Sequence, residues 1–179
     1  LVLGKPLGVG VLSAALKKGK LDAAGYAEML RHTTQLNRVG MALAQIDGVH
    51  AMTDVTGFGL AGHLLKICRG SQLSAQVDLE RLPLIPSAVQ WAREGVSTGA
   101  SGRNWAAYGT DVDWPETAPD WQRTLLTDPQ TSGGLLVSCA PEVADAVVRA
   151  FHGDGFAQAA IVGRMEQSNP RQGHRLRCA

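Results

Sequence analysis

The stretch Met52-Thr53-Asp54-Val55-Thr56-Gly57-Phe58-Gly59-Leu60-Ala61-Gly62-His63 is the most informative in this chain for both fold and function. The apolar-flanked residues 49–55 predict a short strand, and a helix is expected to begin at Thr56 or Gly57 and run through Cys68. Asp54 then stands at a strand end beside a helix N-terminus. A carboxylate in that place can hold a hard cation and an anionic ligand together, so this stretch predicts a metal–phosphate site.

Two interpretations of Asp54 stay open at this point. In the first, its carboxylate is a Mg²⁺ ligand, since Mg²⁺ takes one or two carboxylates together with phosphate oxygens. In the second, it simply caps the helix, which is a common role of aspartate. The glycines at 57, 59 and 62 favour the first. Glycine inside a helix costs about 1 kcal/mol relative to alanine, and it lets the backbone approach a ligand closely.

A second motif, Asp128-Pro129-Gln130-Thr131-Ser132-Gly133-Gly134, precedes an apolar strand expected over 135–139. Its hydroxyls and backbone N–H groups can turn toward an anion, but the same residue types form ordinary tight turns. The spacing does not separate these two interpretations. In a third segment, 99–109, Arg103 can contact phosphate and Asn104 can orient water or a ligand. A solvated loop is the alternative there, and it is the favoured one.

Two histidines and one lysine are further candidates. His32 and His63 lie on expected helices among apolar residues, with no histidine or cysteine partner at ligand spacing, so we expect both to be structural. Lys5 precedes Pro6 and can reach a phosphate, although a lysine in such a place is usually exposed.

Strands and helices alternate along the rest of the chain, which predicts an α/β or α+β layered domain with a mixed sheet flanked by helices. We expect further strands over 1–3, 75–79, 159–165 and 174–178. We expect further helices over 9–18, 23–44, 87–93 and 141–151, with Asp22 as the N-cap of the longest, and a long irregular loop over 97–119. One domain over 9–179 is expected, with 1–8 as a connector from a missing N-terminal domain.

Composition excludes several classes. The 179 residues are 45% hydrophobic and 18% charged with a net charge of +1, which is typical of a soluble globular domain and gives no sign of nucleic-acid binding. No apolar run approaches the roughly 20 residues of a membrane helix. Three scattered cysteines without a C-x-x-C pair indicate a reduced, cytoplasmic protein. The Walker, dinucleotide-binding, G-x-S-x-G and H-E-x-x-H motifs are absent from the sequence, and we expect no catalytic residue on this chain.

Taken together, these motifs resemble selenophosphate synthetase (selenide, water dikinase), a family of the aminoimidazole ribonucleotide synthetase-like superfamily. The matching stretches occur in the family's order and cover residues 5–12, 53–64, 103–104 with 108–109, and 128–136. Two small departures, Ala100 where many relatives have glycine and Trp105 where phenylalanine is usual, concern only the shape of one loop.

The resemblance implies the fold of that superfamily's C-terminal domain, and a reaction in which selenide, ATP and water give selenophosphate, AMP and phosphate. A separate N-terminal domain would carry the reactive cysteine or selenocysteine and most Mg²⁺ ligands, and would build a homodimer. Asp54 would be the one metal ligand from this chain. The implied nucleotide-binding residues are Thr53, Thr56, Gly57, Arg103, Asn104, Asp128, Thr131, Ser132 and Gly133.

Two further hypotheses are kept. A relative with the same architecture, such as thiamine-phosphate kinase or the hydrogenase-maturation dehydratase, shares part of the 128–134 motif. Alternatively, the chain is a binding or assembly module without catalysis, for instance one that docks a selenium-delivery partner.

Overall fold

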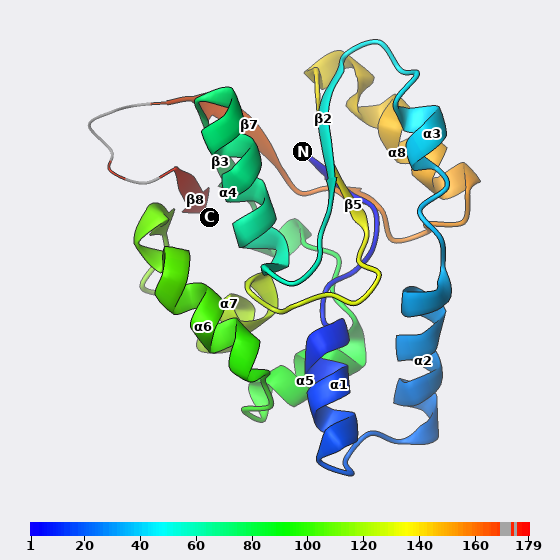
Figure 1. Cartoon of the computed structure of the whole chain (residues 1–179), viewed down its shortest axis with the longest axis vertical. Coiled ribbons are helices and arrows are strands. Elements are labelled where there is room, and N and C mark those ends of the chain that lie inside the picture. The colour runs from blue at the N-terminus through cyan, green and yellow to red at the C-terminus, as the bar shows by residue number, and fades with distance from the viewer. Residues whose placement is uncertain (169–172, 174) are drawn as a thin grey trace.

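The computed structural model describes residues 1–168, 173 and 175–179, and its strands form two four-stranded sheets (Figure 1). The first sheet is antiparallel, in the order β2 (Val49–Asp54), β5 (Leu135–Cys139), β1 (Val2–Leu3), β6 (Ala160–Ile161). The second is mixed, in the order β4 (Val112–Asp113), β8 (Leu176–Cys178), β3 (Leu73–Val77), β7 (Gly163–Gln167). The expected layered class is confirmed, with two sheets in place of one.

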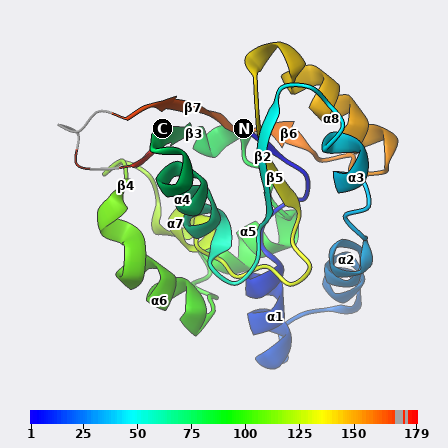
Figure 2. The ribbon, with the colours of Figure 1, turned by 45° about the horizontal axis from the view of Figure 1, so that its top comes forward.

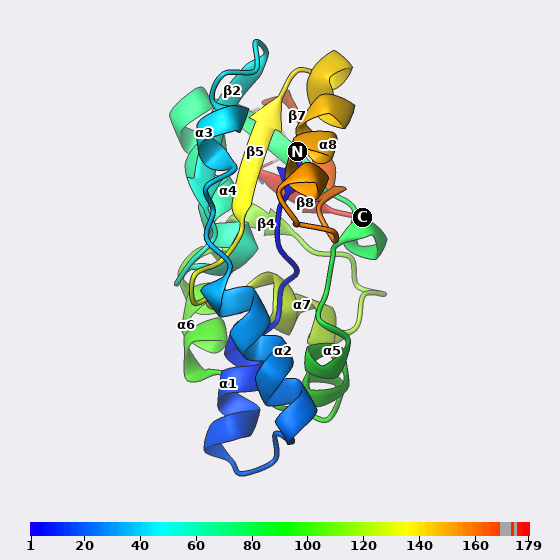
Figure 3. The ribbon, with the colours of Figure 1, turned by 90° about the vertical axis from the view of Figure 1, so that its right-hand side faces the viewer.

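Helices cover both sheets and form a separate helical end. They are α1 (Val9–Lys17), α2 (Ala23–Thr34), α3 (Gly40–Leu43), α4 (Gly59–Ser71), α5 (Pro86–Arg93), α6 (Gly99–Tyr108), α7 (Asp120–Leu126) and α8 (Ala144–Gly153). Short 3₁₀ turns occupy 79–81, 109–111 and 141–143. Helices α3 and α8 lie beside the first sheet (Figure 2), α4 packs on the second, and α1, α2 and α5 gather at one end (Figure 3). No helix in the described part of the chain is long and apolar enough to cross a membrane.

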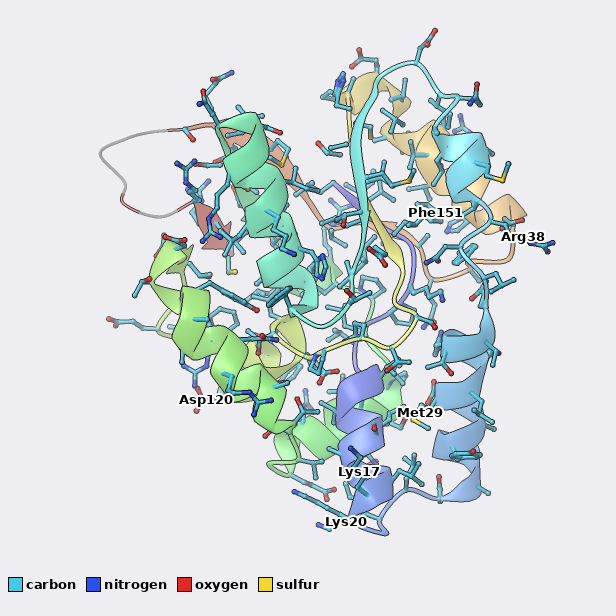
Figure 4. The ribbon with its side chains drawn as sticks, viewed as in Figure 1. Lys17, Lys20, Met29, Arg38, Asp120 and Phe151 are labelled. Atoms are coloured by element: carbon cyan, nitrogen blue, oxygen red, sulfur yellow. The ribbon has the colours of Figure 1, made fainter. Side chains whose placement is uncertain are left out.

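Both faces of the first sheet are buried. Because successive side chains of a strand point to opposite faces, each strand contributes residues to two cores. Leu3 of β1 and Leu136 of β5 face the core that α4 and the second sheet share, while their neighbours Val2 and Val137 face α8. Phe151 of α8 is fully buried in that second core and points inward, whereas Arg38 projects into solvent (Figure 4). Strand β1 is thus a central strand, and residues 1–8 are all buried; their role as a connector stays a prediction.

The single long helix expected over 23–44 is wrong. The Asp22 cap is confirmed, since its side chain accepts a hydrogen bond from Gly25 N at 2.8 Å, but α2 ends at Thr34. The Lys5 ammonium binds the carbonyl oxygens at the C-terminal end of α2, and Gln35 turns to an extended conformation. The apolar residue that suggested continuation, Leu36, is 68% exposed.

The long loop expected over 97–119 is also wrong, because most of it is α6, a 3₁₀ turn and β4. Thr98 is the N-cap of α6 and accepts a hydrogen bond from Ser101 N at 3.1 Å. The buried face of α6 is polar and aromatic, formed by Ser101, Asn104 and Tyr108. An apolar repeat therefore does not reveal this helix. Helix α7 (Asp120–Leu126) is likewise not among the elements expected from the sequence.

The strand expected over 159–165 divides into β6 and β7, which belong to different sheets. At the division, a Cβ atom on Gly163 would lie 2.0 Å from the carbonyl oxygen of Gln76, so only glycine fits. The last strand, expected over 174–178, is found at Leu176–Cys178; His174 lies outside the described residues.

Candidate functional site

The predicted site residues gather where β2 ends and β5 begins. Asp54 pairs with Leu135 across the two strands, and the N–H of Val55 donates to the carbonyl of Gly134 at 2.9 Å. Residues 53–59, here the 53–59 loop, then run beside residues 127–134, the 127–134 loop (Figure 1). The N–H of Gln130 joins the loops through the carbonyl of Thr56 at 3.1 Å. Two motifs that are far apart in the sequence therefore form one surface.

Glycines let the two loops touch backbone to backbone. A Cβ atom on Gly133 would lie 1.8 Å from the carbonyl oxygen of Val55. Gly59 adopts φ +67°, and a Cβ atom there would lie 2.6 Å from the carbonyl carbon of Thr127. Gly57, by contrast, has no atom within 4 Å of such a position. Two of these glycines thus serve contact between the loops rather than approach of a ligand.

Asp54 presents a free carboxylate. Its side chain is exposed and forms no hydrogen bond or ion pair with the residues that the structure describes. The helix-cap interpretation of Asp54 is wrong, because α4 begins only at Gly59 and its N-cap, Phe58, has no side-chain hydrogen bond. The carboxylate is therefore available to a ligand from outside this chain.

Asp128 and Gln130 are directed into the protein instead. Asp128 is fully buried, and its Oδ2 atom also accepts from Gln130 Nε2 at 3.0 Å. The two side chains accept hydrogen bonds from the first backbone N–H groups at the start of α1. Gln130 Oε1 accepts from the N–H groups of Gly8 and Val9. Asp128 Oδ2 accepts from those of Gly10 and Val11. Helix starts leave such groups without intrahelical partners. These two residues supply the cap from about 120 positions further along the chain.

Burial is the main influence on the pKa of the Asp128 carboxyl group. Loss of solvent raises the pKa of this carboxyl group to about 7, against the opposing effect of the hydrogen bonds from Val11, Gln130 and Gly10. The second oxygen, Oδ1, is buried with no partner among the described residues. The group is therefore close to its midpoint of titration at neutral pH.

Lys5 is neither exposed nor free to bind phosphate, so both sequence interpretations of it are wrong. Its side chain is 2% exposed, and Nζ donates to the carbonyl oxygens of His32, Gln35 and Ser132 at 2.9, 2.6 and 2.7 Å. Burial lowers the pKa of the Lys5 ammonium. This lysine ties the end of α2 to the 127–134 loop.

The hydroxyl and cationic candidates divide into two groups. Thr131 and Ser132 are exposed on the 127–134 loop, and Ser132 holds a left-handed φ of 48°. On the other loop, the Thr53 hydroxyl donates to its neighbour's carbonyl at 3.2 Å, and the Thr56 hydroxyl lies 3.2 Å from His63 Nε2. Arg103 is exposed on α6. It forms no hydrogen bond or ion pair with a described residue of the 53–59 loop or the 127–134 loop.

Sequence reasoning missed how the 53–59 loop is held. The N–H of Thr56 donates to His63 Nε2 at 3.0 Å. Asn104 Nδ2 donates to the carbonyls of Gly57 at 2.9 Å and Thr127 at 3.0 Å, and the Tyr108 hydroxyl donates to the carbonyl of Phe58 at 2.6 Å. His63 is structural, as expected. The only pattern in the sequence that indicates this arrangement is the i, i+4 spacing of Asn104 and Tyr108, which places both side chains on one face of a helix.

The donor set fits Mg²⁺ only as part of a larger site. Asp54 is a hard oxygen ligand, but the described residues contain no group of three or more His, Cys, Asp or Glu side chains that could hold a metal ion. Mg²⁺ commonly takes one or two protein carboxylates and completes its coordination with water and phosphate. The described residues can therefore supply one ligand to such a site, and the other ligands would have to come from elsewhere.

Replacing Gly133 by alanine tests the contact between the loops. The new methyl group would meet the Val55 carbonyl at 1.8 Å, so we expect Gly133→Ala to lower the free energy of unfolding by about 2 kcal/mol or more. Gly57→Ala is the matched control, because its methyl group meets nothing within 4 Å. Urea unfolding followed by circular dichroism measures both. Equal stability of the two variants would contradict the contact.

The raised pKa of Asp128 predicts a pH dependence of stability. Between pH 3.8, the usual pKa of an aspartic acid side chain, and about pH 7, the folded chain binds a proton that the unfolded chain has released. This contribution to stability is therefore lost as pH rises through that window, by at most about 1.4 kcal/mol per pH unit. We expect the difference in free energy of unfolding between wild type and Asp128→Asn to change between pH 5 and pH 8. A constant difference would exclude this titration.

The comparisons with known proteins agree with this architecture. Solved structures share the fold: Escherichia coli HypE (TM-score 0.70, 19% identity, 99% of this chain and 45% of that one) and a thiamine-monophosphate kinase from Stenotrophomonas maltophilia (TM-score 0.61, 19% identity, 99% and 48%). A hydrogenase maturation protein HypE in complex with ATP has a TM-score of 0.63 at 16% identity, over 99% of this chain and 47% of that one. At these identities the likeness concerns the fold alone.

Sequence relatives are much closer. The selenide, water dikinase of Paraburkholderia xenovorans is 58% identical over 171 residues, covering 96% of this chain and 48% of the relative. That of Burkholderia ambifaria is 61% identical over 165 residues, covering 92% and 47%. The resemblance inferred from the motifs is confirmed, and the chain spans about half the length of these relatives. Residues 1–173 match the model of the AIR synthase related protein, C-terminal domain, and the chain belongs to that family.

Proposed function

We propose that this chain is the C-terminal part of a selenophosphate synthetase and supplies Asp54 to a Mg²⁺–ATP site. The carrying observation is the exposed carboxylate of Asp54, which has no hydrogen bond or ion pair to the described residues and lies on a loop whose backbone is held by three side chains. Relatives named selenide, water dikinase at 58–61% identity support the choice of reaction. That reaction converts selenide, ATP and water to selenophosphate, AMP and phosphate.

When bound, Mg²⁺ would neutralise phosphate charge during the transfer. Asp54 would hold the ion from the strand end, which is a rigid element. The exposed hydroxyls of Thr131 and Ser132 lie on the neighbouring loop, joined to the Asp54 loop by backbone hydrogen bonds. They are our candidates for contact with phosphate oxygens, together with the exposed backbone of Gly57, whereas Gly133 is buried against Val55 and joins the two loops.

The remaining candidates take different roles in this proposal. Asp128 is buried against the start of α1, and Asn104 is buried against the carbonyls of Gly57 and Thr127. We propose that both position the loops rather than touch the nucleotide. Arg103 would contribute long-range positive charge from α6. Thr53 and Thr56 stay candidates for contact, since each hydroxyl lies beside the strand end that carries Asp54.

A second protein surface would complete the site. Two large apolar side chains near it are exposed: Leu36 at 68%, and Phe58 of the 53–59 loop at 51%. Leu36 precedes Asn37, whose Nδ2 donates to the carbonyl of Gly133 at 2.8 Å. Since the chain spans half of its relatives, a preceding N-terminal domain with the reactive cysteine or selenocysteine would cover them. Homodimerisation through that domain and a cytoplasmic location belong to the same proposal.

The rival reactions have less support. The HypE proteins and thiamine-monophosphate kinases share the fold at identities of 19% or below, whereas the selenide, water dikinases exceed 50% over nearly the whole chain. A non-catalytic docking module stays the alternative of a different class, and nucleotide-binding measurements separate it from the leading proposal.

Replacing Asp54 by asparagine in the full-length protein tests the metal role. The amide keeps the shape but loses the charge that favours Mg²⁺, so we expect AMP formation to fall at least a hundredfold with the fold unchanged. Asp47→Asn, on an exposed acid away from the loops, is the control. AMP release measured by chromatography at saturating Mg²⁺ reports the effect. Near-normal turnover of Asp54→Asn would end the proposal.

The chain on its own should bind Mg²⁺–ATP weakly or not at all. A single carboxylate cannot hold the ion, because the remaining ligands would come from the other domain. Isothermal titration calorimetry should therefore show a dissociation constant no tighter than the millimolar range. Micromolar binding by this chain alone would contradict the proposed division of the site.

A further inference from the structure

Three side chains from two helices hold three consecutive residues of the 53–59 loop. His63 of α4 accepts the N–H of Thr56 at 3.0 Å, Asn104 of α6 donates to the carbonyl of Gly57 at 2.9 Å, and Tyr108 of α6 donates to the carbonyl of Phe58 at 2.6 Å. We call residues 56–58 the 56–58 turn. It begins two positions after Asp54, so its conformation sets the direction in which the chain leaves the strand end.

His63 differs from the other two because it is the acceptor. An imidazole nitrogen that accepts from a backbone N–H carries no proton, so the proton of neutral His63 must lie on Nδ1. Nδ1 is buried and has no partner among the described residues. Burial, and secondarily Lys66, lower the pKa of His63 against the opposing effect of the Asp54 carboxylate. The ring is thus held in a single neutral tautomer whose Nε2 faces the turn.

The space around His63 leaves little room for another arrangement. Its side chain is 5% exposed. One residue before it, a Cβ atom on Gly62 would lie 2.7 Å from the Phe58 side chain and 3.0 Å from the Tyr108 ring. The Phe58 ring itself lies 6.0 Å from the His63 ring, centroid to centroid. The first turn of α4 therefore packs tightly against the 56–58 turn. The hydrogen bond to His63 Nε2 fixes the N–H of Thr56 in that turn.

We propose that His63 is a positioning residue for Asp54. By accepting the Thr56 N–H, it fixes the 56–58 turn and with it the direction of the Asp54 carboxylate. Without this acceptor the partly buried N–H would lose its protein partner, and the turn would rearrange to satisfy it with water. The consequence for catalysis rests on the proposed Mg²⁺–ATP role of Asp54, while the effect on the turn does not.

Two substitutions of His63 and one control separate the hydrogen bond from mere packing. His63→Leu fills the space without an acceptor, and His63→Gln offers Oε1 near the place of Nε2. His32→Leu is the matched control: His32 is also 5% exposed, but its ring contacts Arg31 and makes no bond to the turn. The backbone carbonyl of His32 that Lys5 binds is unaffected by this change.

The first measurement uses this chain and does not depend on any activity. Amide hydrogen exchange followed by NMR should show the Thr56 N–H exchanging about tenfold faster in His63→Leu, with near wild-type exchange in His63→Gln and His32→Leu. The Val137 amide, deep in the first sheet, reports global stability and corrects for it. Unchanged Thr56 exchange in His63→Leu, after that correction, would overturn the proposal.

The second measurement uses the full-length protein and Mg²⁺–ATP. We expect His63→Leu to raise the KM for Mg²⁺–ATP about tenfold or more, with His63→Gln restoring most of it. If Thr56 exchange accelerates but KM stays unchanged, positioning of the catalytic site is refuted. The Asp54→Asn variant then shows which proposal is wrong. Normal turnover of that variant would mean that Asp54 has no role in the Mg²⁺–ATP site. A severe loss of turnover would mean that Asp54 has this role and that His63 does not position it.

Discussion

The buried pair Asp128 and Gln130 is the interaction on which the rest of the structure depends. The two side chains accept four amide N–H groups at the start of α1. Capping of this kind usually comes from residues at the helix start itself. Here it comes from the 127–134 loop, so the start of α1 and the conformation of that loop stabilise each other. The cost is a carboxyl group whose pKa is raised to about 7 and whose Oδ1 atom has no partner among the residues that the structure describes.

Lys5 and the loop glycines extend this arrangement. The Lys5 ammonium joins α2 to the carbonyl of Ser132, and Gly133 lets the 127–134 loop lie directly on Val55. Buried polar groups of this type are stable only when their partners are present. The result is a rigid base beneath exposed hydroxyls and one exposed carboxylate, Asp54. Such a base suits a site that must present a ligand to another protein surface.

Local sequence patterns predicted the elements whose reasons are local. Strand β5, helix α5 and the Asp22 cap follow from apolar runs, a proline and a short-range hydrogen bond, and they occur where expected. Helix α6 was missed because its buried face consists of Ser101, Asn104 and Tyr108, which an apolar repeat cannot detect. The helix expected over 23–44 was too long because Lys5, far away in sequence, binds the carbonyls that end α2.

The sequence by itself determined the family, the layered α/β class and the candidate loops, because these rest on residue types in a fixed order. It also singled out Asp54, whose exposed carboxylate needs no distant partner. Only the tertiary structure decided that Asp128, Asn104 and Lys5 face inward and that His63 holds the turn after Asp54. The roles of Asp128, Asn104 and Lys5 depend on hydrogen bonds between residues far apart in the chain. The role of His63 depends on where α4 begins. Such partners become neighbours only when the chain folds.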